Sequence, residues 1–289
     1  MTLFARDATP SDSASGGPGA AGPSTAAAVV AAAPGTTRLL ARRIGALCLV
    51  ELQKLRHDRT ELFIRAIQPA LWLIIFGETF SRLRTIPTGD ISYRDFLAPG
   101  ILAQSALFIS IFYGIQIIWD RDAGVLAKLL STPTPRAALV AGKAFAAGMR
   151  ALSQVLVVFA VSVVLGVNLI WNPLHLLGSA VVVVLAAAFF SCLSITIAGL
   201  VLSRDRMMGI GQAMTIPLFF ASNALYPIEL MPGWLQVISR INPLSYTVDA
   251  LRGLLIGTPS NLVLDFTVLG VAVVAGVTGA SAVLDRLAR

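Results

Sequence analysis

The chain of 289 residues is far more apolar than a soluble protein. Hydrophobic residues make up 56% of it, charged residues make up only 13%, and the mean hydropathy is +0.80. Soluble domains contain about 25% charged residues, so this composition excludes a soluble enzyme or binding domain and predicts an integral membrane protein. The net charge of +7 requires no nucleic acid partner, because basic loops beside anionic lipid headgroups account for it.

The N-terminal residues differ in composition from the rest of the chain. Residues 1–37 are rich in Ala, Pro, Gly, Ser and Thr and poor in large apolar side chains, which predicts a disordered cytoplasmic tail. Residues 38–289 are expected to form the membrane domain.

Residues 38–59 have the period of an amphipathic helix. Leu40, Ile44, Leu47, Leu52 and Leu55 fall on one side. Basic residues, including Arg42, Arg43 and Lys54, fall elsewhere, so we expect a helix that lies on the inner membrane surface. Glu51 falls inside the apolar stripe, where it either pairs with a neighbouring basic side chain or contacts a partner.

Six apolar stretches follow that are long enough to cross a bilayer. They cover residues 62–81, 97–118, 144–167, 174–202, 208–227 and 262–284. A hydrocarbon core about 30 Å thick needs roughly 20 helical residues, and a backbone in lipid must satisfy its own hydrogen bonds. The predicted fold is therefore an all-α integral membrane protein with six transmembrane helices. The runs are continuous and do not alternate, which argues against a membrane barrel.

Basic residues are distributed unevenly over the loops between these stretches. If the N-terminus is inside, 14 Lys and Arg residues fall on cytoplasmic segments and five on outer loops. Because positive charge in short loops stays on the cytoplasmic side, both termini are expected to be cytoplasmic.

A charged, amphipathic insert, residues 119–143, separates the second stretch from the third. We expect Asp122 to cap a short helix that ends before Pro133 and Pro135. Val125, Leu126, Leu129 and Leu130 would share one face of this helix. That face either packs against this chain's own helices or fills a groove on another protein, and the periodicity alone does not decide between the two.

Residues 226–252 are too apolar for a solvated loop and too interrupted by proline for a full span. They predict short re-entrant helices at the outer interface, with Trp234 and Tyr246 at the level of the headgroups. Asn242, which precedes Pro243, is a candidate cap, and Asp249 and Arg252 are a candidate ion pair. Toward the outer end of the first span, Glu78 is expected to pair with Arg82 across one helical turn; if it faced the interior of a dimer, it could instead attract a cationic substrate.

The chain resembles the type-2 ABC export permeases over residues 38–284. The most specific parts of the resemblance are Asp120, Arg121, Asp122, Gly124, Leu129, Leu130, Pro133 and Arg136 in the insert, and Pro227, Pro232, Trp234, Leu235, Asn242, Pro243, Leu244, Tyr246, Asp249 and Arg252 in the later segment. One departure is Ser222-Asn223-Ala224, where the family often has a Ser-Gly pair.

The resemblance implies roles for the insert and for the helix before the first span. The insert is implied to be a coupling helix that sits in a cleft of an ATPase subunit, with Asp120, Asp122, Gly124, Val125, Leu126, Leu129 and Leu130 as its coupling residues. Residues 38–59, with Arg42, Arg43, Glu51 and Lys54, are implied to form the connecting helix. Family members pair two permeases with two ATPase subunits, so a second copy of this chain is the expected partner in the bacterial cytoplasmic membrane.

The sequence offers no nucleotide, metal or catalytic site. A phosphate-binding Gly-x-x-x-x-Gly-Lys-[Ser/Thr] loop is missing, so ATP and Mg²⁺ are expected only in the partner ATPase. His57 and His175 have no Cys, Asp or Glu at metal-ligand spacing, and Cys48 and Cys192 are expected to be free thiols.

Three classes of function fit these patterns. The favoured prediction is the permease of an ATP-driven exporter of a hydrophobic or amphipathic substrate, such as a drug, a lipid or a lipid-linked glycan. An ion-coupled secondary transporter would need buried ionisable residues or broken helices near the midplane, and we expect almost none in the inner halves of the spans. A membrane-embedded enzyme would need clustered His, Asp or Glu side chains at the membrane boundary.

Overall fold

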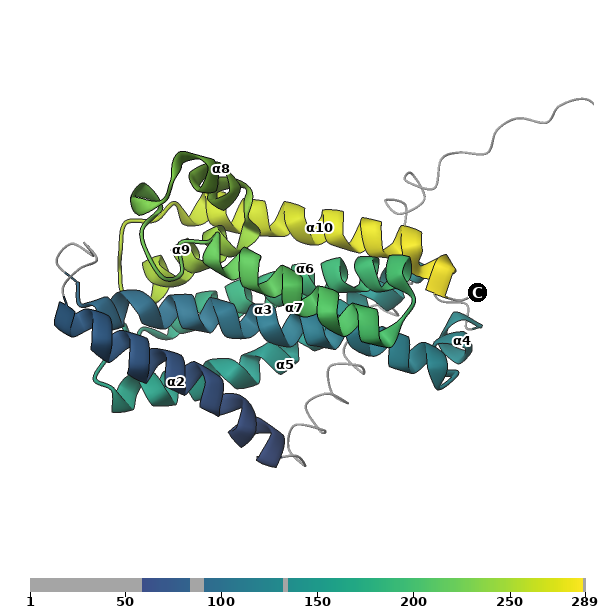
Figure 1. The fold of residues 1–289 in the computed structure, drawn as a ribbon, viewed down its shortest axis with the longest axis horizontal. Coiled ribbons are helices and arrows are strands. Elements are labelled where there is room, and N and C mark those ends of the chain that lie inside the picture. Colours follow the sequence, from purple (N-terminus) through teal and green to yellow (C-terminus); the bar gives the residue numbers. More distant parts are fainter. Residues whose placement is uncertain (1–58, 84–90, 132–134, 288–289) are drawn as a thin grey trace, which may run out of the picture. The chain divides into compact units, whose positions relative to one another are not determined.

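A computed structural model of the chain describes residues 59–83, 91–131 and 135–287, and in these residues the structure is helical with no strand (Figure 1). The long helices are α2 (Arg59–Leu83), α3 (Tyr93–Asp122), α5 (Arg136–Val164), α6 (Pro173–Val201), α7 (Arg204–Phe220) and α10 (Leu262–Leu287). The short elements are α4 (Val125–Leu130), the 3₁₀ helix η1 (Ile228–Leu230), α8 (Gly233–Ile241) and α9 (Pro243–Leu255). The predicted all-α class is confirmed for this part of the chain. The tail, and the surface helix apart from Arg59, lie outside it.

Each of the six predicted spans coincides with one long helix, but only four of these helices are clear candidates to cross a membrane. They are α3, α5, α6 and α10, which are both long and apolar enough. Helix α2 has charged residues near both of its ends, and α7 has only 17 residues, about 26 Å at 1.5 Å per residue. Helix α7 also ends at Phe220, earlier than the predicted span, and a buried turn follows it.

Local sequence signals explain where several helices begin. The hydroxyl of Ser92 accepts a hydrogen bond of 3.1 Å from the backbone amide of Asp95 at the start of α3. Asn172 does the same for Leu174 at 3.0 Å, and Pro173 follows it as the first residue of α6. These side chains satisfy amide groups that the first helical turn leaves unpaired, and proline is favourable at a first helical position.

Helices α3 and α6 form the centre of the buried core. Helix α6 packs against α3, α5, α9 and α10. The hydroxyl of Ser194 on α6 donates a hydrogen bond of 2.7 Å to the carbonyl of Ile111 on α3. Gly114 makes this close approach possible, because a Cβ atom there would lie 2.4 Å from the Cβ of Ser194. Small residues and polar bridges of this kind hold helices together in membranes.

Candidate functional site

The insert begins as a continuation of α3. Helix α3 runs to Asp122, and the turn that follows places Gly124 at a positive φ of 70° before α4 begins at Val125. Glycine adopts this backbone conformation at little cost. The predicted capping role of Asp122 is wrong, because Gly124 is the residue before α4 and no side chain caps that helix.

Charged side chains tie the insert to two other helices. The carboxylate of Asp120 accepts a hydrogen bond from the ammonium of Lys143 on α5. Asp122 pairs with its neighbour Arg121 at 2.9 Å and with Arg204, the first residue of α7, at 2.8 Å. Arg121 also donates to the carbonyl of Leu202 at 3.2 Å. The end of α3 is thereby linked to α5 and to the connection between α6 and α7.

The apolar residues of the insert are not equivalent. Leu126 is only 1% exposed and belongs to the chain's own core, and Leu129 and Leu130 are partly buried against that core. Val125 is 44% exposed. We expected all four large apolar residues to be available to a partner. This is wrong for Leu126, because its side chain is already buried against the chain's own helices. Within α4 the exposed side chains are those of Val125, Ala127 and Lys128.

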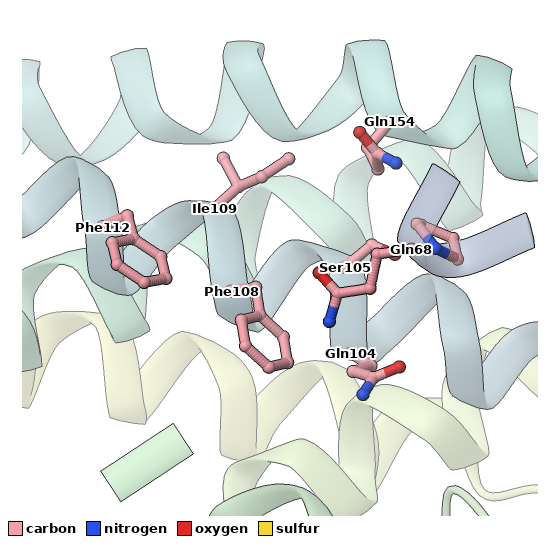
Figure 2. Close-up of a pocket in the computed structure, with 8 residues that line it drawn as sticks. Gln68, Gln104, Ser105, Phe108, Ile109, Phe112 and Gln154 are labelled. Carbon is pink, nitrogen blue, oxygen red and sulfur yellow. The ribbon is translucent and has the colours of Figure 1, made fainter. Parts of the chain in front are cut away.

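A groove with mixed polar and apolar walls lies along α3. Its first cavity has a volume of about 150 Å³ and is lined by Gln68, Pro69, Gln104, Ser105, Phe108, Ile109, Phe112 and Gln154. Figure 2 shows these side chains meeting from α2, α3 and α5. Gln104 and Gln154 are almost fully buried, at 3% and 2% exposure. Buried amides in an otherwise apolar cavity are typical of a site that orients a ligand.

A second cavity continues the groove toward the insert. Its volume is about 280 Å³, and it shares Ile109 and Phe112 with the first cavity. The other lining residues are Tyr113, Ile115, Gln116, Trp119, Arg150 and Met208. On α3 the lining residues recur at steps of three or four, so one face of that helix forms the wall of both cavities.

Arg150 is the feature of this groove that the sequence analysis missed. It lies halfway along α5, a candidate span, and lines the second cavity. A charged side chain at the centre of a membrane helix costs about 2.5–3.5 kcal/mol on insertion scales, and such residues usually face a cavity and serve function. The signal was available, because Arg150 interrupts the apolar stretch 144–167. We expected almost no ionisable residue in the inner halves of the spans, and Arg150 is the exception in the stretch 144–167.

At the opposite end of α3, Arg252 of α9 joins three segments. Its guanidinium donates to the carbonyls of Phe96 at 3.3 Å, Asn223 at 2.7 Å and Ala224 at 3.4 Å, and lies 3.6 Å from the ring centre of Phe96. Burial lowers the pKa of Arg252 to about 10, so the guanidinium stays charged at neutral pH. Arg252 thereby supplies hydrogen-bond donors to the backbone carbonyls of Asn223 and Ala224, in the buried turn that follows α7.

Asp249 and Arg252 attract each other electrostatically, as expected, but the two residues have different hydrogen-bond partners. The Asp249 carboxylate accepts a hydrogen bond of 2.6 Å from the side-chain amide of Asn223. Burial raises the pKa of Asp249. Asn223, where the sequence departs from the family pattern, therefore has two roles. Its side-chain amide donates to the Asp249 carboxylate, and its backbone carbonyl accepts from Arg252.

The predicted capping role of Asn242 is confirmed. Its side-chain oxygen accepts from the amide of Leu244 at 3.0 Å, and its amide nitrogen donates to the carbonyl of Leu218 at 2.7 Å. Pro243 follows as the first residue of α9. Asn242 is 4% exposed, so one buried side chain both starts α9 and connects it to α7.

Helix α8 presents an apolar face that the described residues leave uncovered. Pro227 precedes η1, and Pro232 precedes α8. Trp234, Val237, Ile238 and Ile241 recur at helical spacing and are 67%, 58%, 46% and 74% exposed. Tryptophan is enriched where membrane meets water, so this face suits a lipid interface.

Two further sequence predictions can be placed. The Glu78–Arg82 pair is confirmed at 2.9 Å, and Glu78 also pairs with Arg94 of α3 at 3.2 Å. The connector residues Arg42, Arg43, Glu51 and Lys54 lie outside the described residues.

Four long apolar helices define a multi-pass membrane protein. A family model described as "ABC-2 type transporter" matches residues 42–256, and the chain belongs to this family. A transport permease of Cyanophora paradoxa is 34% identical over 202 residues, which is 69% of each chain. The daunorubicin resistance ABC transporter permease of Streptomyces coeruleorubidus is 25% identical, covering 70% of this chain and 71% of its own. Nodulation protein J of Rhizobium leguminosarum bv. viciae is 27% identical, covering 68% and 76%.

These relatives give the chain the role of a permease in an ABC transporter. The family as a whole implies an ABC ATPase as a partner.

Proposed function

We propose that this chain is the membrane-spanning subunit of an ATP-driven exporter. It moves a hydrophobic or amphipathic substrate, such as a drug, a lipid or a lipid-linked glycan, out of the cytoplasm. A separate ATPase subunit holds ATP and Mg²⁺ and docks on α4, and two copies of the chain form the complete membrane unit.

One observation supports this proposal above the others. The insert is tied by Asp120 to α5 and by Asp122 to α7, and α3, α5 and α7 are the helices that line the second cavity. Force applied to α4 therefore acts on the walls of the groove. Because packed interfaces tend to switch between discrete arrangements, closure of a docked ATPase can change the shape of the route.

The ATPase is proposed to contact the exposed side of α4. Val125 and Lys128 lie on this side, whereas Leu126 anchors the helix in the permease. A lysine beside an exposed valine suits a cleft with an apolar floor and an acidic rim. The absence of a phosphate-binding loop from the sequence supports a separate ATPase polypeptide.

The proposed topology has six spans, which include α2 and the short α7, and both termini in the cytoplasm. The apolar face of α8 supports placing α8 and α9 at the outer membrane surface as re-entrant helices. In intact cells of a bacterial host, cysteines introduced at Gly89 and Ser260 should react with an impermeant reagent, and cysteines at Thr132 and Asp205 should not. The reverse pattern would overturn the orientation.

The substrate class is supported by the groove and by one relative. Both aromatic and amide side chains of α3 line the groove, which suits a molecule with both apolar and polar parts. The relative from Streptomyces coeruleorubidus is named for resistance to daunorubicin.

Transport measured in proteoliposomes tests the proposal. The permease is reconstituted with the ATPase encoded beside it, and a mixed panel of amphipathic dyes is offered with and without ATP. We expect ATP-dependent movement that a protonophore leaves unchanged, whereas a secondary transporter would need the ion gradient and no ATPase.

A matched pair of variants probes the docking site in the same assay. Val125→Asp should abolish transport, because it buries an unpaired charge at the ATPase contact. Asn261→Asp adds the same charge at the opposite end of the bundle and keeps the side-chain oxygen that accepts from Leu264, so it should transport normally. Normal transport by both variants would refute docking on α4.

A further inference from the structure

We propose that Arg150 and the groove along α3 bind the negatively charged headgroup of an amphipathic substrate. The inference rests on the proposed export function and narrows its substrate class to amphipaths that carry a carboxylate or phosphate group. The apolar part of such a molecule would lie against Phe108, Ile109 and Phe112.

Charge is distributed unevenly along the groove. Among the described residues that line the two cavities, Arg150 has the only formal charge, and no acidic side chain lines either cavity. Arg150 has partners within the chain, but a guanidinium has five N–H donors and can serve several acceptors. Its planar fork matches the two oxygens of a carboxylate or phosphate.

The position of Arg150 along the route is also specific. The second cavity, which Arg150 lines, is the one nearer the insert, since its lining on α3 extends from Ile109 to Trp119. Tyr113 and Gln116 provide neutral polar groups in the same cavity. An anionic head entering from the side of the insert would therefore meet the positive charge first.

The first cavity offers a different environment beyond this point. Gln68, Gln104, Ser105 and Gln154 supply uncharged donors and acceptors, and Phe108 supplies an aromatic wall. From Gln104 to Trp119 the lining covers 15 steps along α3, roughly 22 Å at 1.5 Å per residue. Neutral amides can pass a headgroup onward without holding it as tightly as a charge would.

The accessible apolar wall of the groove suits the tail of such a molecule. Phe112, shared by both cavities, is 44% exposed. A single alkyl chain or a fused aromatic system can lie against it while its head reaches Arg150.

The test is direct binding to the permease alone, without ATPase or ATP. Purified protein in phosphatidylcholine nanodiscs is titrated with radiolabelled dodecyl phosphate, with empty nanodiscs as the background. Competition by dodecyl maltoside, dodecyltrimethylammonium and inorganic phosphate separates the contributions of the tail and the charge. We expect saturable binding of dodecyl phosphate, at least about tenfold weaker binding of the neutral and cationic probes, and no competition by inorganic phosphate.

Three variants connect the preference to the residue. Arg150→Gln should weaken binding of dodecyl phosphate about tenfold or more, and Arg150→Lys should retain most of it. Gln116→Glu leaves Arg150 in place and puts a negative charge in the same cavity, so it should weaken the anionic probe and strengthen the cationic one. This third variant keeps the test decisive if Arg150→Gln does not fold.

The outcomes separate this inference from the export function. Equal binding of anionic and cationic probes, or unchanged binding in both Arg150→Gln and Gln116→Glu, would overturn the charge assignment even if ATP-driven transport were demonstrated. Competition by inorganic phosphate alone would overturn the amphipathic class. Competition by phosphatidylglycerol in the nanodisc would support the assignment with a bilayer lipid as the source, and lack of it would support a soluble amphipath.

Discussion

The two ends of α3 are held in physically different ways. At the insert end, Asp122 and Arg204 form an ion pair whose side chains are 33% and 51% exposed. At the other end, Arg252 is 6% exposed and bonds to three backbone carbonyls from two segments. Exposed ion pairs contribute little to stability, whereas a buried charge with satisfied hydrogen bonds is costly to disturb. The bundle therefore has a rigid end at α9 and a more easily displaced end at α4.

This difference suits a protein that receives force at one end. Groups that must move are drawn from the less stable parts of a structure. The residues of α3 that line the groove lie between these two ends. In the proposed mechanism, a displacement of α4 would act on the groove while Arg252 holds the other end of α3.

The largest expected effect is at the rigid end. Arg252→Ala leaves three buried carbonyls without their donor and should lower the free energy of unfolding by at least about 3 kcal/mol. The measurement is unfolding by sodium dodecyl sulfate in mixed micelles. Arg240→Ala removes an exposed arginine from α8 and is the control, with an expected change within about 0.5 kcal/mol. Equal effects of the two substitutions would contradict the rigid end.

A smaller effect is expected where α4 packs on the bundle. Leu126→Ala should destabilise the permease by roughly 2 kcal/mol, toward the low end for a buried leucine, because a helix of six residues can shift to fill the space. Val125→Ala, one residue earlier and 44% exposed, should change stability by less than about 0.5 kcal/mol. If the two variants unfold alike in the same micelles, the two sides of α4 are not distinct.

The smallest effect on stability is expected at the exposed ion pair. Asp122→Asn should cost at most about 1 kcal/mol, because the bond to Arg204 is accessible to water. The same variant should reduce the amount of substrate moved per ATP hydrolysed, since α7 is then held less firmly to the insert. A normal transport ratio in proteoliposomes would mean that this pair does not transmit force.

The long helices could be predicted from the sequence because each apolar run fixes one of them. The end of α7 could not, since residues up to 227 are apolar and only the buried turn after Phe220 shows where the helix stops. The burial of Leu126 could not be predicted either, because periodicity identifies an apolar helix face but not the surface that covers it.

Partners distant in sequence were also beyond prediction. Asp122 and Arg204 are 82 residues apart, and Arg252 and Phe96 are 156 residues apart, so their contacts depend on the packed bundle. Arg150 is different, because a charge inside an apolar run is visible in the sequence and is itself a sign of function.

The central claim, that the exposed side of α4 faces the ATPase, is tested most directly by photo-crosslinking. Val125→p-benzoylphenylalanine and Val237→p-benzoylphenylalanine place the same reactive group at the two ends of the bundle, on residues that are 44% and 58% exposed. After illumination of membranes that contain both subunits, position 125 should crosslink to the ATPase and position 237 should not. Crosslinking from position 237 with none from position 125 would contradict the account.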